Sequence, residues 1–520
     1  MRNDDMKPLS KKVFLKITPP GIGDIIGDKE RLLKSLEKEF GKVEISQRIL
    51  KAIYPLCREA NWEITLTLVA HEGQWEIVRL EPGDTTKSHY GLAVDLGSTT
   101  VTMELVDLNS GEILAEESIF NHQIDFGDDI LSRIFYTKSK PLHLKEVQES
   151  TLQSFRELML MLSERTGVAS ETCGIMVVSG NTTMIHFLLG IDPWPIFEAP
   201  FTPVFNHTGF FDAQEISLPI EGLIYCVPSV ANYFGGDILS GLLVSDLHKK
   251  EELGLFIDIG TNGEMVLGNK NFLLAGAGAA GPALEGGISK NGMKATDGAV
   301  DSVVIEDNIL KLTTIGGSRP RGICGSGIVD ILAQMLLNGW IDFSGHFNTG
   351  VTDRVIKKDG EYAVAYAWED ESATGEVLLF TQTDISQFMD TKAAANTMVA
   401  YLLDSLGVEA TEVKRLYTAG AFGTYINLES AITIGLYPDL PRERFVSLGN
   451  GSLRGSYALL INGELLKEIM ALQREVRYLE FGAATDFLTQ MFAARFLPHT
   501  NFDLYPTVKA ELIKRGRLRL

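Results

Sequence analysis

The sequence predicts an α/β protein in which two similar domains face each other across a cleft, with a smaller α/β domain before them. Three observations lead to this prediction. A short stretch occurs twice, as residues 95–100 and as residues 258–263. Each copy lies between two β-leaning runs, and about one domain's length of chain separates the copies. A repeat at that distance indicates paired domains rather than a short-period solenoid.

The runs on either side of each copy predict the order strand, tight turn, strand. The first copy follows the apolar run 90–94 and precedes the run 101–106. The second copy follows the apolar run 254–257 and precedes the run 264–267. Each copy is therefore expected to form the turn of a β-hairpin.

The residues of these turns favour the binding of nucleotide phosphate. Gly97 and Gly260 allow tight turns in which backbone N–H groups converge on an anion. Asp95 and Asp258 stand at strand ends, where carboxylates can hold a hydrated Mg²⁺, an ion that needs few protein ligands. Short polar side chains, and one further glycine in the second turn, complete the two stretches: Ser98, Thr99, Thr100, Thr261, Asn262 and Gly263.

A plain hairpin turn is the alternative interpretation of the Asp-x-Gly-Ser/Thr pattern. It is favoured for either copy taken alone, because isolated motifs have many false matches. Two copies, each after an apolar strand, favour the phosphate-binding interpretation instead.

Composition limits the class of protein. The chain has 520 residues, of which 45% are hydrophobic, and a net charge of −21. A chain of this length is expected to hold about three domains with a large core. The negative charge argues against a nucleic-acid partner, and the basic segment 514–519 is interpreted as a solvated end. There is no apolar run of membrane-spanning length and no signal-peptide core, so we expect a cytoplasmic protein.

The four cysteines do not have the short spacing of a zinc or iron–sulfur site. They are Cys57, Cys173, Cys226 and Cys324. Most are expected to be small core residues in a reducing compartment. Cys324 could be a nucleophile, but no base partner is evident, so a place in the core or at a helix start is favoured.

The first domain is expected to span residues 1–88 and to mix strands with two helices. The predicted strands and helices are the strand 13–17, the helix 28–39, the helix 45–60, and the paired strands 62–70 and 74–80. The turn at 81–84 marks the boundary to the next domain.

The second domain is expected to span residues 89–252. After its hairpin come a strand at 113–118, a long helix that ends at Gly167, and a buried strand at 174–179 with a capping turn. A strand at 223–227 and a helix opened by Pro228 follow. The pair Gly235–Gly236 within that helix has two open explanations: close helix packing, or an approach to nucleotide with Asp237 near the phosphates.

The third domain is expected to span residues 253–520, with an insertion near 342–378. Its small-residue stretch 275–287 predicts a strand end that leads into a helix and lets a ligand approach. A glycine-rich turn at 322–327 opens a helix and suits either an anion or close packing. A helix at 383–406 and a strand at 415–419 follow. The turn after that strand is a candidate adenosine shelf: Gly420, Ala421, Phe422 and Gly423.

The two hairpins and the late glycine-rich turn resemble the actin, sugar-kinase and heat-shock chaperone ATPase superfamily. The resemblance implies two ribonuclease-H-like ATPase domains that close on Mg-ATP around a nucleotide cleft. It makes residues 95–100 phosphate loop one and residues 258–263 phosphate loop two. Gly420 and Gly423 would hold the adenosine.

Within that superfamily the sequence is most similar to the ATP-dependent reductive activators of corrinoid proteins. The similarity covers nearly the whole chain, and residues 1–88 resemble that family's linker domain. The strings that carry it are Glu81-Pro82-Gly83-Asp84-Thr85-Thr86, Asn121-His122-Gln123-Ile124, Ser132-Arg133-Ile134, Ser179-Gly180-Asn181-Thr182-Thr183-Met184, Gly235-Gly236-Asp237, Gly322-Ile323-Cys324-Gly325-Ser326-Gly327 and Leu497-Pro498-His499.

One departure from the family pattern affects the expected cofactors. Family members carry a ferredoxin-like domain with a cysteine-bound [2Fe–2S] cluster at one end, whereas this sequence begins at the linker-type domain. We therefore expect ATP and Mg²⁺ as cofactors, no iron–sulfur cluster in this chain, and a separate low-potential electron donor. The resemblance also implies a corrinoid protein of a B12-dependent methyltransferase system as the partner, and a homodimer.

The resemblance implies an ATPase that returns a partner's Co(II) corrinoid to Co(I). Asp95 and Asp258 would position Mg²⁺, while Asp237, Glu264 or Glu285 would orient the attacking water. Two alternatives remain open because a fold does not determine function. One is a small-molecule kinase with Asp237 as its base, and the other is a nucleotide-gated binding or chaperone module without electron transfer.

Overall fold

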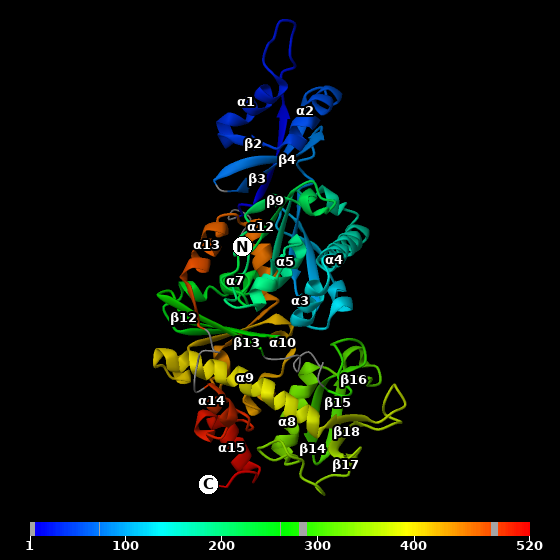
Figure 1. Cartoon of the computed structure of the whole chain (residues 1–520), viewed down its shortest axis with the longest axis vertical. Helices are drawn as coiled ribbons and strands as arrows, with labels where there is room; N and C mark the ends of the chain where they lie inside the picture. The colour runs from blue at the N-terminus through cyan, green and yellow to red at the C-terminus, as the bar shows by residue number, and fades with distance from the viewer. Residues whose placement is uncertain (1–5, 72, 261, 280–288, 480–486, 520) are drawn as a thin grey trace. The chain divides into compact units, whose positions relative to one another are not determined.

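The computed structural model describes residues 6–71, 73–260, 262–279, 289–479 and 487–519. The chain divides into two compact units, shown in Figure 1. Unit 1 comprises Met1–Val244 and Gly451–Glu475, and unit 2 comprises Ser245–Asn450 and Val476–Leu520. The mixed α/β class expected from the sequence is confirmed in both units.

The N-terminal part of unit 1 is a four-stranded sheet, in the order β1-β3-β4-β2, covered by two helices. Apolar side chains of the sheet and of both helices form one core. The strands and helices are β1 (Ser10–Lys16), α1 (Asp28–Phe40), β2 (Val43–Ile45), α2 (Gln47–Glu59), β3 (Glu63–His71) and β4 (Gln74–Pro82).

The helix predicted from residue 45 begins two residues later than expected, because a short strand precedes it. Val43 and Ile45 lie beside β4 as the parallel strand β2. Ser46 then caps α2, and its side chain accepts a hydrogen bond from the Ile49 amide at 3.3 Å. A serine with extended backbone before a helix is a typical N-cap, so it ends the strand and starts the helix.

The second part of unit 1 is a six-stranded sheet in the order β7-β6-β5-β8-β10-β9. Its strands are β5 (Tyr90–Leu96), β6 (Thr100–Asp107), β7 (Ile113–Phe120), β8 (Ile175–Gly180), β9 (Phe210–Asp212) and β10 (Leu223–Cys226). The first predicted hairpin is thus confirmed as β5–β6, and β8 runs parallel to β5 in the centre of the sheet.

Helices surround this sheet (Figure 1). They are α3 (Ile130–Ser139), α4 (His143–Thr166), α5 (Thr182–Leu189), α6 (Trp194–Phe197), α7 (Gly236–Ser245), α12 (Gly451–Ile461) and α13 (Leu465–Glu475). Helices α3 to α6 contribute to the core of the sheet. Leu92, Val94 and Leu96 of β5 share the core with α4. The alternate residues of a strand point to the opposite face, where Gly91 meets Leu460 of α12.

The helix predicted from Pro228 is wrong in its start, since α7 begins only at Gly236. The approach of the backbone to the strand ends explains the difference. A Cβ at Gly235 would lie 2.4 Å from Asn181 Cα, and a Cβ at Gly236 would lie 2.5 Å from Val227 O. Both positions therefore need glycine, and the preceding residues form an irregular segment rather than a helical turn.

Unit 2 contains a second six-stranded sheet in the order β21-β20-β11-β12-β13-β22 and two three-stranded sheets. The large sheet consists of β11 (Gly254–Ile259), β12 (Asn262–Asn269), β13 (Phe272–Ala279), β20 (Arg415–Ala419), β21 (Phe445–Gly449) and β22 (Val476–Leu479). The small sheets consist of β14 (Ala299–Glu306), β15 (Ile309–Thr314), β16 (Gly322–Ile323), β17 (Val355–Lys358), β18 (Glu361–Ala367) and β19 (Leu378–Thr381). The second predicted hairpin is confirmed as β11–β12.

The helices of unit 2 pack around one large core. They are α8 (Gly325–Asn338), α9 (Gln382–Leu406), α10 (Gly420–Tyr425), α11 (Leu428–Thr433), α14 (Phe487–Ala494) and α15 (Pro506–Lys514). None of the helices that the structure describes is both long enough and apolar enough to cross a bilayer.

A buried lysine fastens the C-terminal segment to α9. Lys392 is fully buried, and its Nζ donates hydrogen bonds to the carbonyl oxygens of Ala494 (2.7 Å), Phe496 (2.8 Å) and Pro498. Burial lowers the pKa of this amine well below its ordinary value. A lysine amine is costly to bury, and the three carbonyls accept its hydrogen bonds. These hydrogen bonds hold the Leu497–His499 string against α9.

Candidate functional site

The first candidate phosphate loop, loop one (residues 95–100), is the turn of the β5–β6 hairpin in unit 1. Asp95 lies near the end of β5, directly opposite Thr102 of β6. A Cβ at Gly97 would lie 2.5 Å from the Thr100 carbonyl oxygen. Only glycine fits a turn this tight, as the sequence predicted.

Buried side chains from later segments hold the carbonyls of loop one. Arg133 is 0% exposed, and its Nη1 donates to the Ser98 carbonyl at 2.7 Å and to Gln123 Oε1 at 3.2 Å. Asn121 Nδ2 donates to the Gly97 carbonyl at 2.9 Å. In a trans peptide the C=O and the following N–H point in opposite directions. The Ser98 and Thr99 amides therefore point away from these side chains, as anion binding by the turn requires.

Helix α12 reaches the same hairpin from the far end of the sequence. Ser452 Oγ donates to Asp95 Oδ1 at 2.7 Å, and Ser456 Oγ donates to the Val94 carbonyl at 2.9 Å. A Cβ at Gly455 would lie 2.3 Å from Ser240 Cβ, so α12 crosses α7 in close contact. The carboxylate of loop one is thus oriented by a serine that sequence reasoning did not single out.

Asp237 lies in the first turn of α7, where its Oδ1 accepts a hydrogen bond from the Ile238 amide at 2.9 Å. The glycines before it are in close contact with the strand ends described above. This contact accounts for Gly235 and Gly236 by close packing. A role for Asp237 near phosphate stays a prediction.

The second candidate phosphate loop, loop two (residues 258–263), is the turn of the β11–β12 hairpin in unit 2. Asp258 lies directly opposite Glu264 of β12, so the two side chains point to the same face of the sheet. Glu264 is only 8% exposed. Two carboxylates on one face at a strand end make an acidic pair suited to a hydrated divalent cation.

The absence of a side chain at Gly420 leaves room for the Asp258 carboxylate. β20 runs parallel to β11 and sets Ala419 beside Asp258. Gly420 has φ +80°, and a Cβ there would lie 2.6 Å from Asp258 Oδ1. Both the left-handed backbone and the close approach therefore require glycine. The buried Tyr437 is a neighbour, and burial together with the Asp258 charge raises the pKa of its hydroxyl.

The predicted glycine-rich turn after β20 is the first turn of helix α10 rather than a loop. A tight approach explains why glycine suits this helical position, since a Cβ at Gly423 would lie 3.1 Å from Thr418 Cβ. Thr261 and Glu285 lie outside the described residues, and the side chains of Asn262, Ala421 and Phe422 are also not described. Their predicted roles stay predictions.

The donor set fits Mg²⁺ better than a metal held by many protein ligands. Among the described residues there is no cluster of three or more His, Cys, Asp or Glu side chains that could hold a metal ion. Mg²⁺ keeps most of its waters and needs only one or two carboxylates. Within unit 2, the Asp258–Glu264 pair by itself offers that number of carboxylates.

The turn at residues 322–327 is accounted for by packing. A Cβ at Gly327 would lie 2.3 Å from the Val300 carbonyl, and a Cβ at Gly322 would lie 2.6 Å from the Asn291 carbonyl. Cys324 is the N-cap of α8, and its Sγ donates to the Val300 carbonyl at 3.3 Å. All four cysteines are buried and unbridged, as expected.

Comparison with known proteins decides the family. Three family models match consecutive stretches of the chain: the RACo linker region over residues 2–87, the RACo middle region over 90–250, and the C-terminal domain of RACo, described as the ASKHA domain, over 252–509. The chain belongs to the RACo family. The family resemblance noted from the sequence is thereby confirmed.

Relatives agree with this RACo assignment. The chain is 30% identical over 412 residues to "Corrinoid activation enzyme RamQ" of Eubacterium limosum, covering 77% of this chain and 69% of that protein. It is 22% identical over 428 residues to "[Co(II) methylated amine-specific corrinoid protein] reductase" of Methanosarcina barkeri, covering 74% and 73%. A solved structure, "Reductive activator for corrinoid,iron-sulfur protein", superposes with a TM-score of 0.89 at 36% identity, covering 98% of this chain and 82% of that one.

Proposed function

We propose that this RACo-family chain is an ATPase that promotes the reduction of Co(II) to Co(I) in a partner corrinoid protein. The repeated hairpin supports the proposal most directly, with Asp95 and Asp258 at equivalent strand ends of two six-stranded sheets. The relatives named above supply the corrinoid chemistry. The partner is a corrinoid protein of a methyltransferase system.

The nucleotide is held by the two loops. Backbone N–H groups and the side chains of Thr99, Thr100, Thr261 and Asn262 bind the phosphates, and the α10 turn at residues 420–423 receives the adenosine. Mg²⁺, when bound beside Asp95 and Asp258, neutralises charge on the phosphate oxygens. The turns at Gly97 and Gly420, each too tight for a Cβ, support this assignment.

Glu264 orients the attacking water in this proposal. Its position opposite Asp258, on the same face of the hairpin and largely buried, supports the choice. Asp237 belongs to the other unit. A carboxylate that accepts a hydrogen bond from water directs its lone pair at the γ-phosphorus, from which ADP departs.

ATP supplies free energy to the cobalt reduction only if its nucleotide states bind the corrinoid protein differently. Domain closure on ATP is the bistable element that we propose for this coupling. One electron passes from a separate low-potential donor to Co(II), giving Co(I), while ATP and water give ADP and phosphate. We further propose a cytoplasmic homodimer.

The experiment measures ATP hydrolysis and the Co(I) absorbance of added Co(II) corrinoid proteins, with a chemical one-electron donor present. We expect low basal hydrolysis that rises with one corrinoid protein and forms Co(I) only with ATP. Asp258→Ala should abolish both signals. Hydrolysis that responds to no corrinoid protein, or phosphate transfer to a metabolite, would overturn the proposal and favour a kinase.

A further inference from the structure

A large cavity lies within unit 1, with a volume of about 1190 Å³. Among the described residues, its walls come from β1 and the residues before it, the adjoining ends of β3 and β4, the edge strand β9 with its neighbour β10, residues next to β5 and β6, and helix α13. No residue of loop one or of β5 lines it. The cavity is therefore a feature separate from the proposed phosphate site, and its volume exceeds that needed for a small organic ligand.

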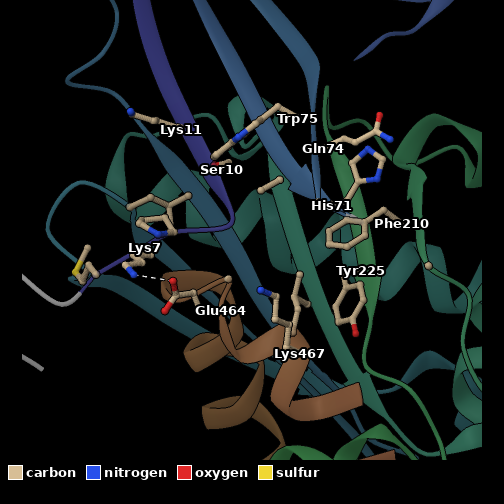
Figure 2. A pocket seen from close by; sticks show the side chains of 18 of the residues that line it. Lys7, Ser10, Lys11, His71, Gln74, Trp75, Phe210, Tyr225, Glu464 and Lys467 are labelled. Atoms are coloured by element: carbon tan, nitrogen blue, oxygen red, sulfur yellow. Dashed lines mark hydrogen bonds and ion pairs between the residues drawn. The ribbon is translucent and has the colours of Figure 1, made fainter. Parts of the chain in front are cut away.

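Aromatic rings form one wall of the cavity. The His71 and Phe210 ring centroids are 5.5 Å apart with planes tilted by 36°, and those of Phe210 and Tyr225 are 4.7 Å apart with a 34° tilt. Figure 2 shows these three rings following one another along the wall, with Trp75 on the neighbouring strand. These rings pack against one another, and the half-buried His71, Trp75 and Phe210 leave some ring surface on which a planar aromatic ligand can stack.

The charge of the lining is opposite to that of the chain. The net charge of the protein is −21, yet the described residues that line the cavity include several cations and a single carboxylate, Glu464. The cations are Lys7, Lys11, Lys12, Lys467 and Arg474. A concave site with such an excess of positive charge attracts anions.

Two of these cations are available to a ligand. Lys7 pairs with Glu464 at 2.6 Å, Lys12 pairs with Glu81 at 2.6 Å, and Lys11 pairs with Glu39. Lys467 lies near enough to Glu464 to help lower the pKa of that carboxyl, and Arg474 Nε donates to the Met470 carbonyl at 2.9 Å. Neither side chain forms a close ion pair with a described carboxylate. Both lie on α13, and Figure 2 shows Lys467.

Tyr225 supports Phe210 but offers almost no surface to a ligand. It is only 2% exposed, its hydroxyl oxygen is buried, and its ring centroid lies 4.7 Å from that of Phe210. Figure 2 shows this hydroxyl at the end of the ring that points away from Phe210. A ligand in the cavity is therefore expected to contact His71 and Phe210 rather than Tyr225.

We propose that this cavity binds a planar aromatic anion of mononucleotide size. The ring system of the ligand stacks on the half-buried rings of His71 and Phe210. Its phosphate or carboxylate is bound by Lys467 and Arg474. The site is independent of the proposed ATP site and does not require that assignment to hold.

Flavin mononucleotide is a suitable probe, because its fluorescence reports stacking on aromatic rings. The titration uses the full chain saturated with a non-hydrolysable Mg-ATP analogue, so that the probe cannot enter the ATP site. We expect flavin mononucleotide to bind at least about tenfold more tightly than riboflavin, which lacks the phosphate. AMP in competition tests whether a purine ring serves as well as a flavin.

Variants assign the binding to this cavity. Lys467→Ala with Arg474→Ala should weaken flavin mononucleotide by about tenfold or more and bring it to the affinity of riboflavin. Phe210→Ala should weaken both flavins by about three- to tenfold, because the ligand loses a stacking partner. Lys270→Ala with Lys514→Ala removes two cations of unit 2 that do not line the cavity and should change nothing.

Three results would overturn the inference. The first is equal affinity for flavin mononucleotide and riboflavin, and the second is unchanged binding in the α13 double variant. The third is no binding of flavin mononucleotide or AMP at 1 mM, which means a binding free energy weaker than about −4 kcal/mol. ATP hydrolysis of the α13 variant should stay at the wild-type rate, so failure here is distinguishable from failure of the ATPase proposal.

Discussion

Loop one and loop two have the same hairpin but different residues opposite the aspartate. Asp95 faces Thr102, whereas Asp258 faces Glu264. Two positions further along, the buried side chains also differ: β6 has Glu104 where β12 has Val266. The local backbone is thus repeated while the acidic pair belongs to loop two alone. The chemistry of the two loops is therefore expected to be unequal.

The supports of the two loops differ as well. Loop one is held by hydrogen bonds from buried side chains, above all Arg133 and Asn121. At loop two a backbone passes so close to Asp258 that only glycine fits. Loop one is therefore expected to be sensitive to the loss of a polar side chain, and loop two to the gain of a single methyl group at Gly420.

The largest expected effect is an asymmetry between the two aspartates. Asp258→Asn should lower kcat for ATP hydrolysis by about 1000-fold, because the acidic pair loses its charge where phosphate charge develops. Asp95→Asn should lower it by only about 10- to 100-fold. Steady-state hydrolysis with matched melting curves checks this. Equal losses would show that the acidic pair gives loop two no special role.

The next effect concerns the support of loop one. Arg133→Met should lower the free energy of unfolding by about 3 kcal/mol and raise KM for ATP, because buried carbonyls lose their donor. Urea denaturation and hydrolysis assays measure both quantities. Arg165→Met is the control, since this exposed arginine contacts only the surface groups of Glu117 and the Glu116 carbonyl among the described residues, and it should change stability by less than about 0.5 kcal/mol.

The support of loop two is tested by Gly420→Ala. The new Cβ meets the Asp258 carboxylate, and a positive φ is unfavourable for alanine, so kcat should fall by about 30-fold, equivalent to about 2 kcal/mol. Gly407→Ala has the same kind of backbone, with φ +65° and nothing within 4 Å. It should cost about 1 kcal/mol of stability and leave kcat unchanged. Similar kcat values in the two variants would remove the steric argument.

The smallest expected effect is a pH dependence of stability caused by Glu104 on β6. Burial, with the charge of Glu116 added, raises the pKa of Glu104 to about 7. The folded protein therefore binds this proton more tightly than the unfolded chain, so stability falls as pH rises from about 4.5 to about 7. Glu104→Gln should remove this fall and be more stable than wild type at pH 8 by about 1–2 kcal/mol. Denaturation midpoints at pH 5 and pH 8 measure the difference, and parallel curves for both proteins would contradict it.

Sequence patterns predicted the two hairpins and most of the long helices, because each depends on local periodicity and turn residues. The strand 415–419 and the helix that ends at Gly167 are examples. The helix expected from Pro228 was wrong, because nothing local shows that Gly235 and Gly236 contact strand ends far away in the sequence. The turn at 420–423 was identified, but its helical form was not.

The supports of the candidate site were harder to predict than its loops. Arg133 belongs to a string noted only for its resemblance to a family, and its contact with Ser98 depends on the fold of the intervening chain. Ser452 gave no signal beyond a glycine-rich turn that opens a helix. Asp258 and Glu264 could be placed on one face of a hairpin, but the glycine that shapes their surroundings lies on another strand.

The return of residues 451–475 to unit 1 has a consequence for biosynthesis. A ribosome makes the β5 strand early but releases α12, with the serine that binds Asp95, only after nearly all of unit 2 has been made. The β5–β6 hairpin therefore lacks its contact with α12 during the synthesis of most of unit 2. A chain truncated near residue 250 would lack α12 and leave one face of this sheet uncovered. Chaperones and proteases are expected to recognise such a chain.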